Sequence, residues 1–515
     1  VSRARVEAPS LAECAAAILA SILLVFTFPD FNLWPLAWVG LVPLLIAIAR
    51  RPVLSRAFLL GWITGSLFFF GSCHWLTYSM VHYGRIPGWI AYLLLIPGAL
   101  ALGLFPAAFA LVLASAARLL RTKALFLAPF IWVAFEWARL GVTGQLWNAI
   151  GYSQAYKPLL IQSAYWGGVY GVSFLIVSTN AALAFMIVNR CKRAVVITTA
   201  VLAVVAILVL GSNAPSLPRE AVIPAAHVVA LQPNVPMDLV KSAEEMRELT
   251  TRHINMSKSA LRQLPNDGLP RLVIWPESPM NFTYASDSQF REFISGFARA
   301  NNTALLFNSQ EPAPNDGIYN SAVLINEAGR LIGQYDKIRL MPFGEYVPLP
   351  RWLPGANLIT AMVGEFSPGT NYKLLSVGSA QAGVFICIES AYPWIARTFA
   401  REGADVLINI SNDGYLGRTA VMRQHLANAV FRAVENGRPV VRVTNTGITA
   451  YITAKGEVRD QTSGFEPAVR IWTVTRNQST PTFYTKHGDI FALVCGVLTV
   501  LIFIAWLARR SEPTH

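Results

Sequence analysis

Long runs of apolar residues restrict this 515-residue chain more than any other feature. A helix needs about 20 mostly apolar residues to cross a bilayer. By that rule we predict eight spans, near residues 11–28, 34–49, 57–81, 88–116, 124–138, 166–189, 194–211 and 489–508. We therefore expect a bundle of seven transmembrane helices over 1–211, and a C-terminal helix with a short tail over 485–515.

Basic residues lie in alternate loops between these spans: Arg3 and Arg5; Arg50, Arg51 and Arg56; Arg118, Arg121 and Lys123; Arg190, Lys192 and Arg193; Arg509 and Arg510. The positive-inside rule then places both chain ends in the cytoplasm and the segment between the last two spans on the opposite side. The net charge of +13 is explained by these loops, so we expect no nucleic-acid partner.

The segment 220–484 is different in kind. Short strand-like runs at 227–234, 271–277, 303–308, 321–326, 382–389, 405–411 and 439–445 alternate with helical patterns near 285–300, 391–403 and 419–437. Strands that alternate with helices indicate an α/β domain.

One of the five cysteines, Cys387, lies in this polar part of the chain, and the scattered set predicts neither a disulfide framework nor a metal site. Cys387 ends the apolar run GVFIC. A strand end that runs into a helix presents a nucleophile well, and a helix N-terminus lowers a thiol pKa. A buried core cysteine is the alternative.

Three charged residues are further candidates. Glu277 directly follows the run LVIWP and is placed for a general base, although a solvated loop acid has the same pattern. Lys337 offers a charge for an oxyanion, or simply faces solvent. Glu345 lies in an apolar loop, where its burial requires a partner.

Taken together, the motifs WPE at 275–277, YDKIRLMPFGEYVP at 335–348 and ICIE at 386–389 resemble the nitrilase superfamily with its Glu-Lys-Cys triad. Combined with the predicted spans, the chain resembles the bacterial apolipoprotein N-acyltransferases. The stretches LWNAIGYSQ at 146–154, ISNDGYLG at 410–417, RQH at 423–425 and the run 432–450 carry the same resemblance.

The resemblance implies a periplasmic nitrilase-like αββα-sandwich on an inner-membrane bundle. It implies acyl transfer from a phospholipid to the α-amino group of a diacylglyceryl-modified apolipoprotein through a cysteine thioester. Cys387 would be the nucleophile, Glu277 the general base and Lys337 the oxyanion stabiliser, with Glu345 and Glu389 in support. We expect a monomer without cofactor or metal.

Two residues depart from the family pattern, Ile388 in place of an aromatic residue and Tyr415 in place of tryptophan, which bears on acyl-chain or donor preference. The apolar stretch 340–369, with Leu349, Trp352 and Phe366, is either a lid at the lipid interface or a segment packed on the protein.

Other interpretations stay open at this stage. Glu136 lies in a predicted span, where it is either a functional acid or a structural partner of Arg139, and His425 is assigned to helix packing or the site. A membrane-tethered amidase would share the triad, and a transporter or receptor would use the large domain only to bind a ligand.

Overall fold

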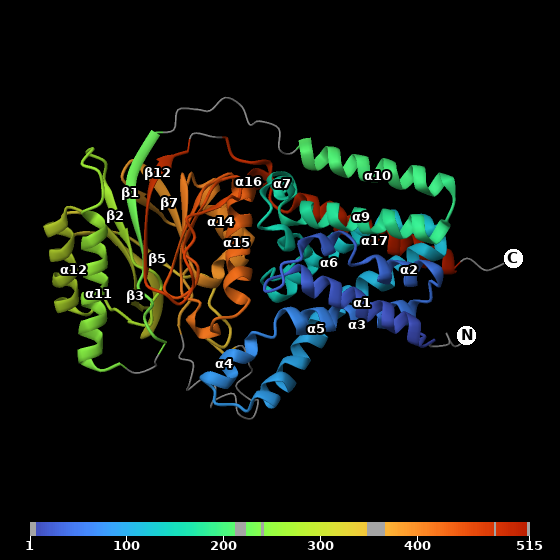
Figure 1. Cartoon of the computed structure of the whole chain (residues 1–515), viewed down its shortest axis with the longest axis horizontal. Helices are drawn as coiled ribbons and strands as arrows, with labels where there is room; N and C mark the ends of the chain where they lie inside the picture. Colours follow the sequence, from blue (N-terminus) through green and yellow to red (C-terminus); the bar gives the residue numbers. More distant parts are fainter. Residues whose placement is uncertain (1–6, 212–222, 238–240, 348–365, 478–479, 512–515) are drawn as a thin grey trace. The chain divides into compact units, whose positions relative to one another are not determined.

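The computed structural model describes residues 7–211, 223–237, 241–347, 366–477 and 480–511 (Figure 1). The chain divides into two compact units. One unit holds Val1–Pro215, Thr419–Ala427 and Lys486–His515, and the other holds Ser216–Arg418 and Asn428–Thr485. We call them the helical unit and the sandwich unit.

The helical unit contains α1 (Leu11–Thr27), η1 (Trp34–Trp38), α2 (Val42–Arg50), α3 (Leu54–Ser72), α4 (Leu76–His82), α5 (Gly88–Leu120), η2 (Arg121–Leu127), α6 (Ala128–Thr143), η3 (Ile150–Gln154), α7 (Pro158–Ile161), α8 (Ala164–Gly167), α9 (Val169–Asn189), α10 (Lys192–Gly211) and α17 (Ile490–Ser511). The predicted span 57–81 is not one helix, because α3 ends at Ser72 and the short α4 follows.

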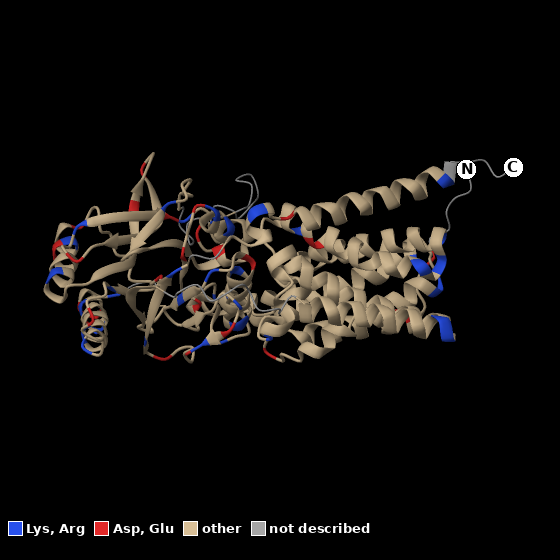
Figure 2. Ribbon diagram, turned by 90° about the horizontal axis from the view of Figure 1, so that it is seen from above, with Lys and Arg blue, Asp and Glu red and all other residues tan. Residues whose placement is uncertain are grey.

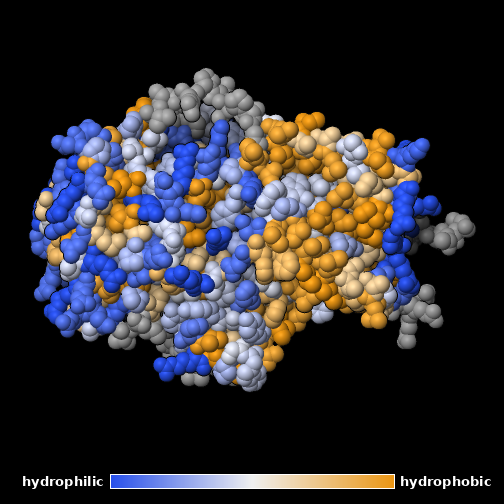
Figure 3. Space-filling model, viewed as in Figure 1, coloured by the Kyte–Doolittle hydropathy of each residue, from blue (hydrophilic) through white to orange (hydrophobic). Residues whose placement is uncertain are grey.

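Five apolar helical segments among the described residues are long enough to cross a membrane: Leu54–Ser72, Gly88–Thr143, Val169–Asn189, Lys192–Gly211 and Ile490–Arg509. Two shorter apolar segments, Leu11–Thr27 and Trp34–Arg50, precede them. Figure 2 shows lysine and arginine gathered at the end of the helical unit where α1 begins and α17 ends, and Figure 3 shows its visible face to be largely apolar. These features are consistent with a membrane protein.

Small residues let helices α3 and α5 approach closely. A Cβ atom added to Gly61 would lie 2.4 Å from the Pro106 carbonyl oxygen, and one added to Gly103 would lie 2.2 Å from Ser66 Oγ. Close approach of backbones at small residues is a common basis of helix association in lipid, where the hydrophobic effect does not drive helices together.

The helical unit also includes the first turns of α15 (Val421–Asn436). The Gln424 amide oxygen accepts from the indole nitrogens of Trp75 and Trp147, at 3.0 and 2.9 Å. Its nitrogen donates to the carbonyls of Pro29 and Ser72, at 3.2 and 3.0 Å. This buried amide thus satisfies polar groups that would otherwise be costly to bury in an apolar bundle.

The sandwich unit has two six-stranded sheets. The first runs in the order β12 (Ala468–Arg476), β1 (Ile223–Gln232), β2 (Arg271–Ile274), β3 (Ala304–Ala313), β4 (Gly317–Ile325), β5 (Leu331–Asp336). The second runs β11 (Val458–Arg459), β10 (Ala450–Ile452), β9 (Val440–Thr444), β8 (Val406–Ser411), β7 (Ala380–Ile386), β6 (Leu374–Val377). In each sheet three central strands are parallel, and the strands that flank them pair antiparallel.

Helices cover the sheets, with α11 (Ala243–Leu261) and α12 (Ser288–Asn301) on one side and α14 (Pro393–Arg401) with the second half of α15 on the other (Figure 1). The short η4 (Cys387–Ala391) and η5 (Gly414–Leu416) complete the unit, and the boundary between the two units falls within α16 (Phe483–His487). The expected α/β sandwich is confirmed, and all seven predicted strand runs coincide with strands.

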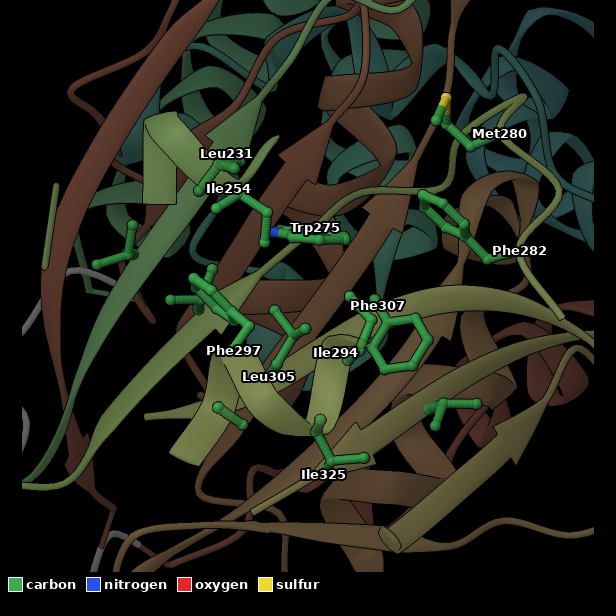
Figure 4. Packing of buried hydrophobic residues seen from close by; sticks show 14 of the residues in the cluster. Leu231, Ile254, Trp275, Met280, Phe282, Ile294, Phe297, Leu305, Phe307 and Ile325 are labelled. Atoms are coloured by element: carbon green, nitrogen blue, oxygen red, sulfur yellow. The ribbon is translucent and has the colours of Figure 1, made fainter. Parts of the chain in front are cut away.

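Trp275 is central to the core between the first sheet and α11 and α12 (Figure 4). Its ring is buried among Phe282, Phe297 and Phe307, and its indole nitrogen donates to Ser257 Oγ at 3.1 Å. Because Trp275 follows β2 directly, this large anchored side chain fixes the chain just before Glu277.

Gly383 sets the distance between β7 and α14. A Cβ atom at this position would lie 2.4 Å from Phe399 Cβ. Gly383→Ala should therefore destabilise the protein by about 1–3 kcal/mol through overpacking. Gly296→Ala is the matched control, because nothing lies within 4 Å of its added Cβ in α12 and alanine favours a helix by about 0.5–1 kcal/mol. Thermal unfolding in detergent should show opposite shifts for the two variants, and equal shifts would contradict this packing.

Candidate active site

Cys387 follows β7 and begins the 3-10 helix η4. Its φ angle is +53°, a left-handed conformation that is strained for a residue with a side chain. The strand thus runs directly into a helix, as predicted, but this helix is one short 3-10 segment, and the α-helix α14 begins only at Pro393. The thiol is presented by the left-handed first residue of that short segment.

Lys337 lies between two carboxylates. It directly follows β5, and its ammonium nitrogen is 3.4 Å from Glu277 Oε1 and 2.9 Å from the Glu345 carboxylate. Only 1% of the lysine is exposed, so the two carboxylates supply the partners that a buried charge requires. The position of Glu345 in an apolar loop predicts a partner for its charge, and that partner is Lys337.

Asn320 lies in β4 and contacts the same carboxylates, although no motif in the sequence indicates it. Its side-chain amide donates to Glu277 Oε1 at 3.0 Å and to Glu345 Oε1 at 2.6 Å. The amide of Met341 donates to the other oxygen of Glu345 at 2.7 Å. A polar residue such as Asn320 in a mostly apolar strand indicates a buried hydrogen-bonding group, but the sequence does not identify the partners of that group.

The electrostatics follow from this arrangement. Burial alone would lower the pKa of Lys337, but the Glu277 and Glu345 carboxylates raise that pKa well above its ordinary value. Burial raises the pKa of the Cys387 thiol, and the charge of Glu277 raises it further, while Lys337 lowers it. The lysine is thus held as a cation and the thiol in its protonated form, which contradicts the expected lowering of the thiol pKa by a helix.

Glu389 connects the two sheets at the site. It is completely buried in η4 and accepts from the backbone amide of Ile386 at 2.7 Å, on the nucleophile strand. It also accepts from the amides of Ile338 and Arg339, at 2.8 and 3.0 Å, and from the Tyr335 hydroxyl. One carboxylate therefore ties the chain beside Lys337 to the chain beside Cys387.

A second polar network supports the nucleophile strand from β8 and β9. Arg442 donates to Asp413 Oδ2 at 3.0 Å and also contacts the Asn409 amide oxygen. Asn409 in turn donates to the Phe385 carbonyl at 3.2 Å. Asp413 is buried, and its charge raises the pKa of Cys387.

The remaining sequence candidates lie elsewhere. Glu136 makes no ion pair with Arg139 within the described part of the chain. It accepts from the Ile150 amide and the Trp132 indole, at 2.8 and 2.9 Å. His425 is buried in the helical unit, and its ring centroid lies 5.8 Å from that of Trp147.

Most of the apolar stretch 340–369 falls outside the described residues, including Leu349 and Trp352. Its described end is tied to the site, since the amide of Phe366 donates to the Glu345 carbonyl at 3.0 Å. Across the described ranges, no group of three or more metal-binding side chains is arranged to hold an ion.

Two family models match the chain. The apolipoprotein N-acyltransferase N-terminal domain matches residues 20–182, and the carbon-nitrogen hydrolase model matches residues 228–484. The second match covers the sandwich unit and all five candidate site residues, so this unit has a nitrilase-like fold.

Curated relatives match along nearly the whole chain. An apolipoprotein N-acyltransferase of Geobacter metallireducens is 34% identical and covers 97% of this chain and 96% of its own. One of Thermotoga maritima is 29% identical and covers 96% and 94%. A solved structure of Saccharomyces cerevisiae Nit3, of the nitrilase superfamily, is 19% identical with a TM-score of 0.39 and covers 50% of this chain and 92% of its own. The Geobacter metallireducens relative, with 34% identity over nearly the full length of both chains, shows that this chain belongs to the apolipoprotein N-acyltransferase family.

Proposed function

We propose that this protein transfers a fatty acyl chain from a membrane phospholipid to the N-terminal α-amino group of a diacylglyceryl-modified apolipoprotein. The observation that supports this most directly is the convergence of a partly buried thiol, a bridged Glu277–Lys337–Glu345 group and Glu389 at the strand ends of two sheets. Cys387 is the nucleophile in this proposal. The names of the curated relatives support the same reaction.

In the first half-reaction, Cys387 attacks the ester carbonyl of the phospholipid while its proton passes to Glu277. Two of the three ammonium hydrogens of Lys337 face Glu277 and Glu345, which leaves one for the oxyanion of the tetrahedral intermediate. The carbon–oxygen bond of the ester then breaks, and Glu277 returns the proton to the departing lysophospholipid. A thioester of Cys387 remains.

In the second half-reaction, the lipoprotein amine attacks the thioester and Glu277 takes the amine proton. The carbon–sulfur bond breaks, an amide forms, and the thiol is regenerated when Glu277 returns the proton. The two substrates thus react in turn at one thiol, as in a ping-pong scheme. Glu345 and Glu389 act as positioning residues, because one holds Lys337 and the other holds the two chain segments.

We further propose that the protein is a monomer of the bacterial inner membrane, with eight spans over 1–211 and 485–515. Both termini would be cytoplasmic, and the domain 220–484 periplasmic. The basic residues at one end of the helical unit support this orientation (Figure 2). The proposed chemistry needs no cofactor, since thiol, base and oxyanion stabiliser all come from side chains.

Incubation of the purified enzyme with phospholipid should add the mass of one acyl chain at Cys387. Mass spectrometry of the intact protein and of its peptides detects this thioester, and hydroxylamine should release it. Cys387→Ala should give no adduct. An adduct on that variant would contradict the assignment, and acylation by simple amides but not by phospholipid would favour an amidase.

Lys337→Met should abolish acyl-enzyme formation and destabilise the fold by about 3–5 kcal/mol, because two buried carboxylates lose their shared cation. The double variant Lys337→Met/Glu345→Gln removes one of those charges, so its melting temperature should recover while activity stays absent. Thermal unfolding and the thioester assay measure the two effects separately. If the double variant were no more stable than the single one, Lys337 would not be the counter-charge of Glu345.

The rate of thioester formation should rise as the pH increases through about 7. Burial raises the pKa of Glu389 from 4.5 to about 7, although hydrogen bonds from Ile386 and Arg339 oppose this shift. Only the carboxylate can accept from all four donors around it, so the ionised form positions the site.

Stability should change in the opposite direction. Between pH 4.5 and about 7 the folded protein holds a proton on Glu389 that the unfolded chain has lost, so this contribution to stability falls as the pH rises. A pH series of rates and melting temperatures should show both trends in the wild type, and Glu389→Gln should lack the corresponding step in each.

A further inference from the structure

Arg339 lies at the edge of the active site. It is two residues after Lys337, and its backbone amide donates to Glu389 Oε1 at 3.0 Å. The other oxygen of the same carboxylate accepts from Ile386, the residue before Cys387. A single buried side chain therefore fixes the backbone of Arg339 next to the nucleophile strand.

Two aromatic rings hold the Arg339 side chain. The centre of its guanidinium lies 5.3 Å from the ring centroid of Trp394 and 6.0 Å from that of Tyr392. Both rings belong to the segment that leads from η4 into α14. Cation–π contacts with ring faces orient a guanidinium and leave its N–H groups able to donate at the edge.

The charge of Arg339 is not neutralised as the other cations of the site are. Lys337 has Glu277 and Glu345, and Arg442 has Asp413. Arg339 is exposed, and among the residues that the structure describes its guanidinium has no carboxylate partner. An oriented guanidinium without a counter-charge is suited to an incoming anion with two oxygens, for which arginine gives paired, charge-assisted hydrogen bonds.

We propose that Arg339, held by Trp394 and Tyr392, binds the phosphodiester of the acyl-donor lipid. This inference rests on the proposed function, in which the donor is a phospholipid. Only the glycerol backbone separates the phosphodiester of such a lipid from its reactive ester. The acceptor carries a thioether and acyl esters but no phosphate, so Arg339 serves the first half-reaction and not the second.

The test measures thioester formation in single turnovers over a range of donor concentrations. Arg339→Gln should raise the half-saturating concentration of phospholipid about 10- to 100-fold, as expected for the loss of a charge-assisted hydrogen bond, with little change in the maximal rate. Arg339→Lys should retain part of the affinity. Arg299→Gln, which removes an exposed arginine of α12 paired with Glu292, is the matched control and should behave as wild type.

A phosphate-free acyl donor, such as a p-nitrophenyl ester, distinguishes a role of Arg339 in binding the phosphate from a role in positioning the catalytic groups. Arg339→Gln should react with it as wild type does, and transfer from a preformed thioester to a lipopeptide amine should also be unchanged. An equal loss with both donors would overturn the proposal, because Arg339 would then position the catalytic groups. Unchanged affinity for phospholipid would overturn it as well.

The phosphate of the surrounding bilayer is a second source of the same chemistry. A short-chain phospholipid below its micelle concentration presents the donor alone, and the effect of Arg339→Gln should persist there. An effect seen only in vesicles would assign Arg339 to the membrane surface and overturn the proposal. If the wild type itself formed no thioester with any phospholipid, the proposed function would fail, which is a different outcome from an unaffected Arg339 variant.

Discussion

One ammonium group, that of Lys337, lies between the carboxylates of Glu277 and Glu345, and the rest of the site is arranged around it. An ammonium on a lysine that is 1% exposed cannot persist without counter-charges, and the two carboxylates supply them. The side-chain amide of Asn320 donates one further hydrogen bond to each of the two carboxylates. Glu277 and Lys337 follow the strands β2 and β5 of the first sheet, Asn320 lies within β4, and Glu345 lies in the loop after β5.

The proposed nucleophile, Cys387, follows a strand of the second sheet, so the candidate site depends on how the two sheets are joined. Glu389 performs this joining, since it accepts from Ile386 on one side and from Ile338 and Arg339 on the other. Behind the nucleophile strand, Asn409 and Arg442 extend the polar contacts to β8 and β9. The strained turn at Cys387 is thereby supported from both directions, as a left-handed non-glycine residue requires.

The sequence predicts those parts of the structure that depend on local pattern. Apolar runs predict the helices of the helical unit, and the central strands are apolar because both of their faces are buried. The apolar pattern does not predict every strand. Two examples are β5, an edge strand with polar residues, and β12, which is partly exposed. The pairing of Ile223 with Arg476 joins positions too far apart for any local pattern to reveal.

The candidate site residues are indicated by their resemblance to a known order of motifs, whereas the contacts between them are visible only in the structure. Nothing in the sequence indicates that Asn320 bridges two carboxylates, because its partners come from other strands and loops. The left-handed turn at Cys387 is likewise set by tertiary contacts. For the same reason, the expectation that a helix N-terminus would lower the thiol pKa was wrong, and burial dominates.

A raised thiol pKa has a consequence for acyl transfer through a thioester. A thiolate of high pKa is a strong nucleophile but a poor leaving group, whereas the two half-reactions need both properties in turn. The negative charge of Glu277 opposes the thiolate, and Lys337 favours it. In the proposed mechanism, Glu277 accepts a proton from the thiol or from the amine, so its opposing charge disappears while Glu345 still faces the charged Lys337. On that proposal, the proton on Glu277 would lower the thiol pKa at the moments when the thiolate forms and when it leaves.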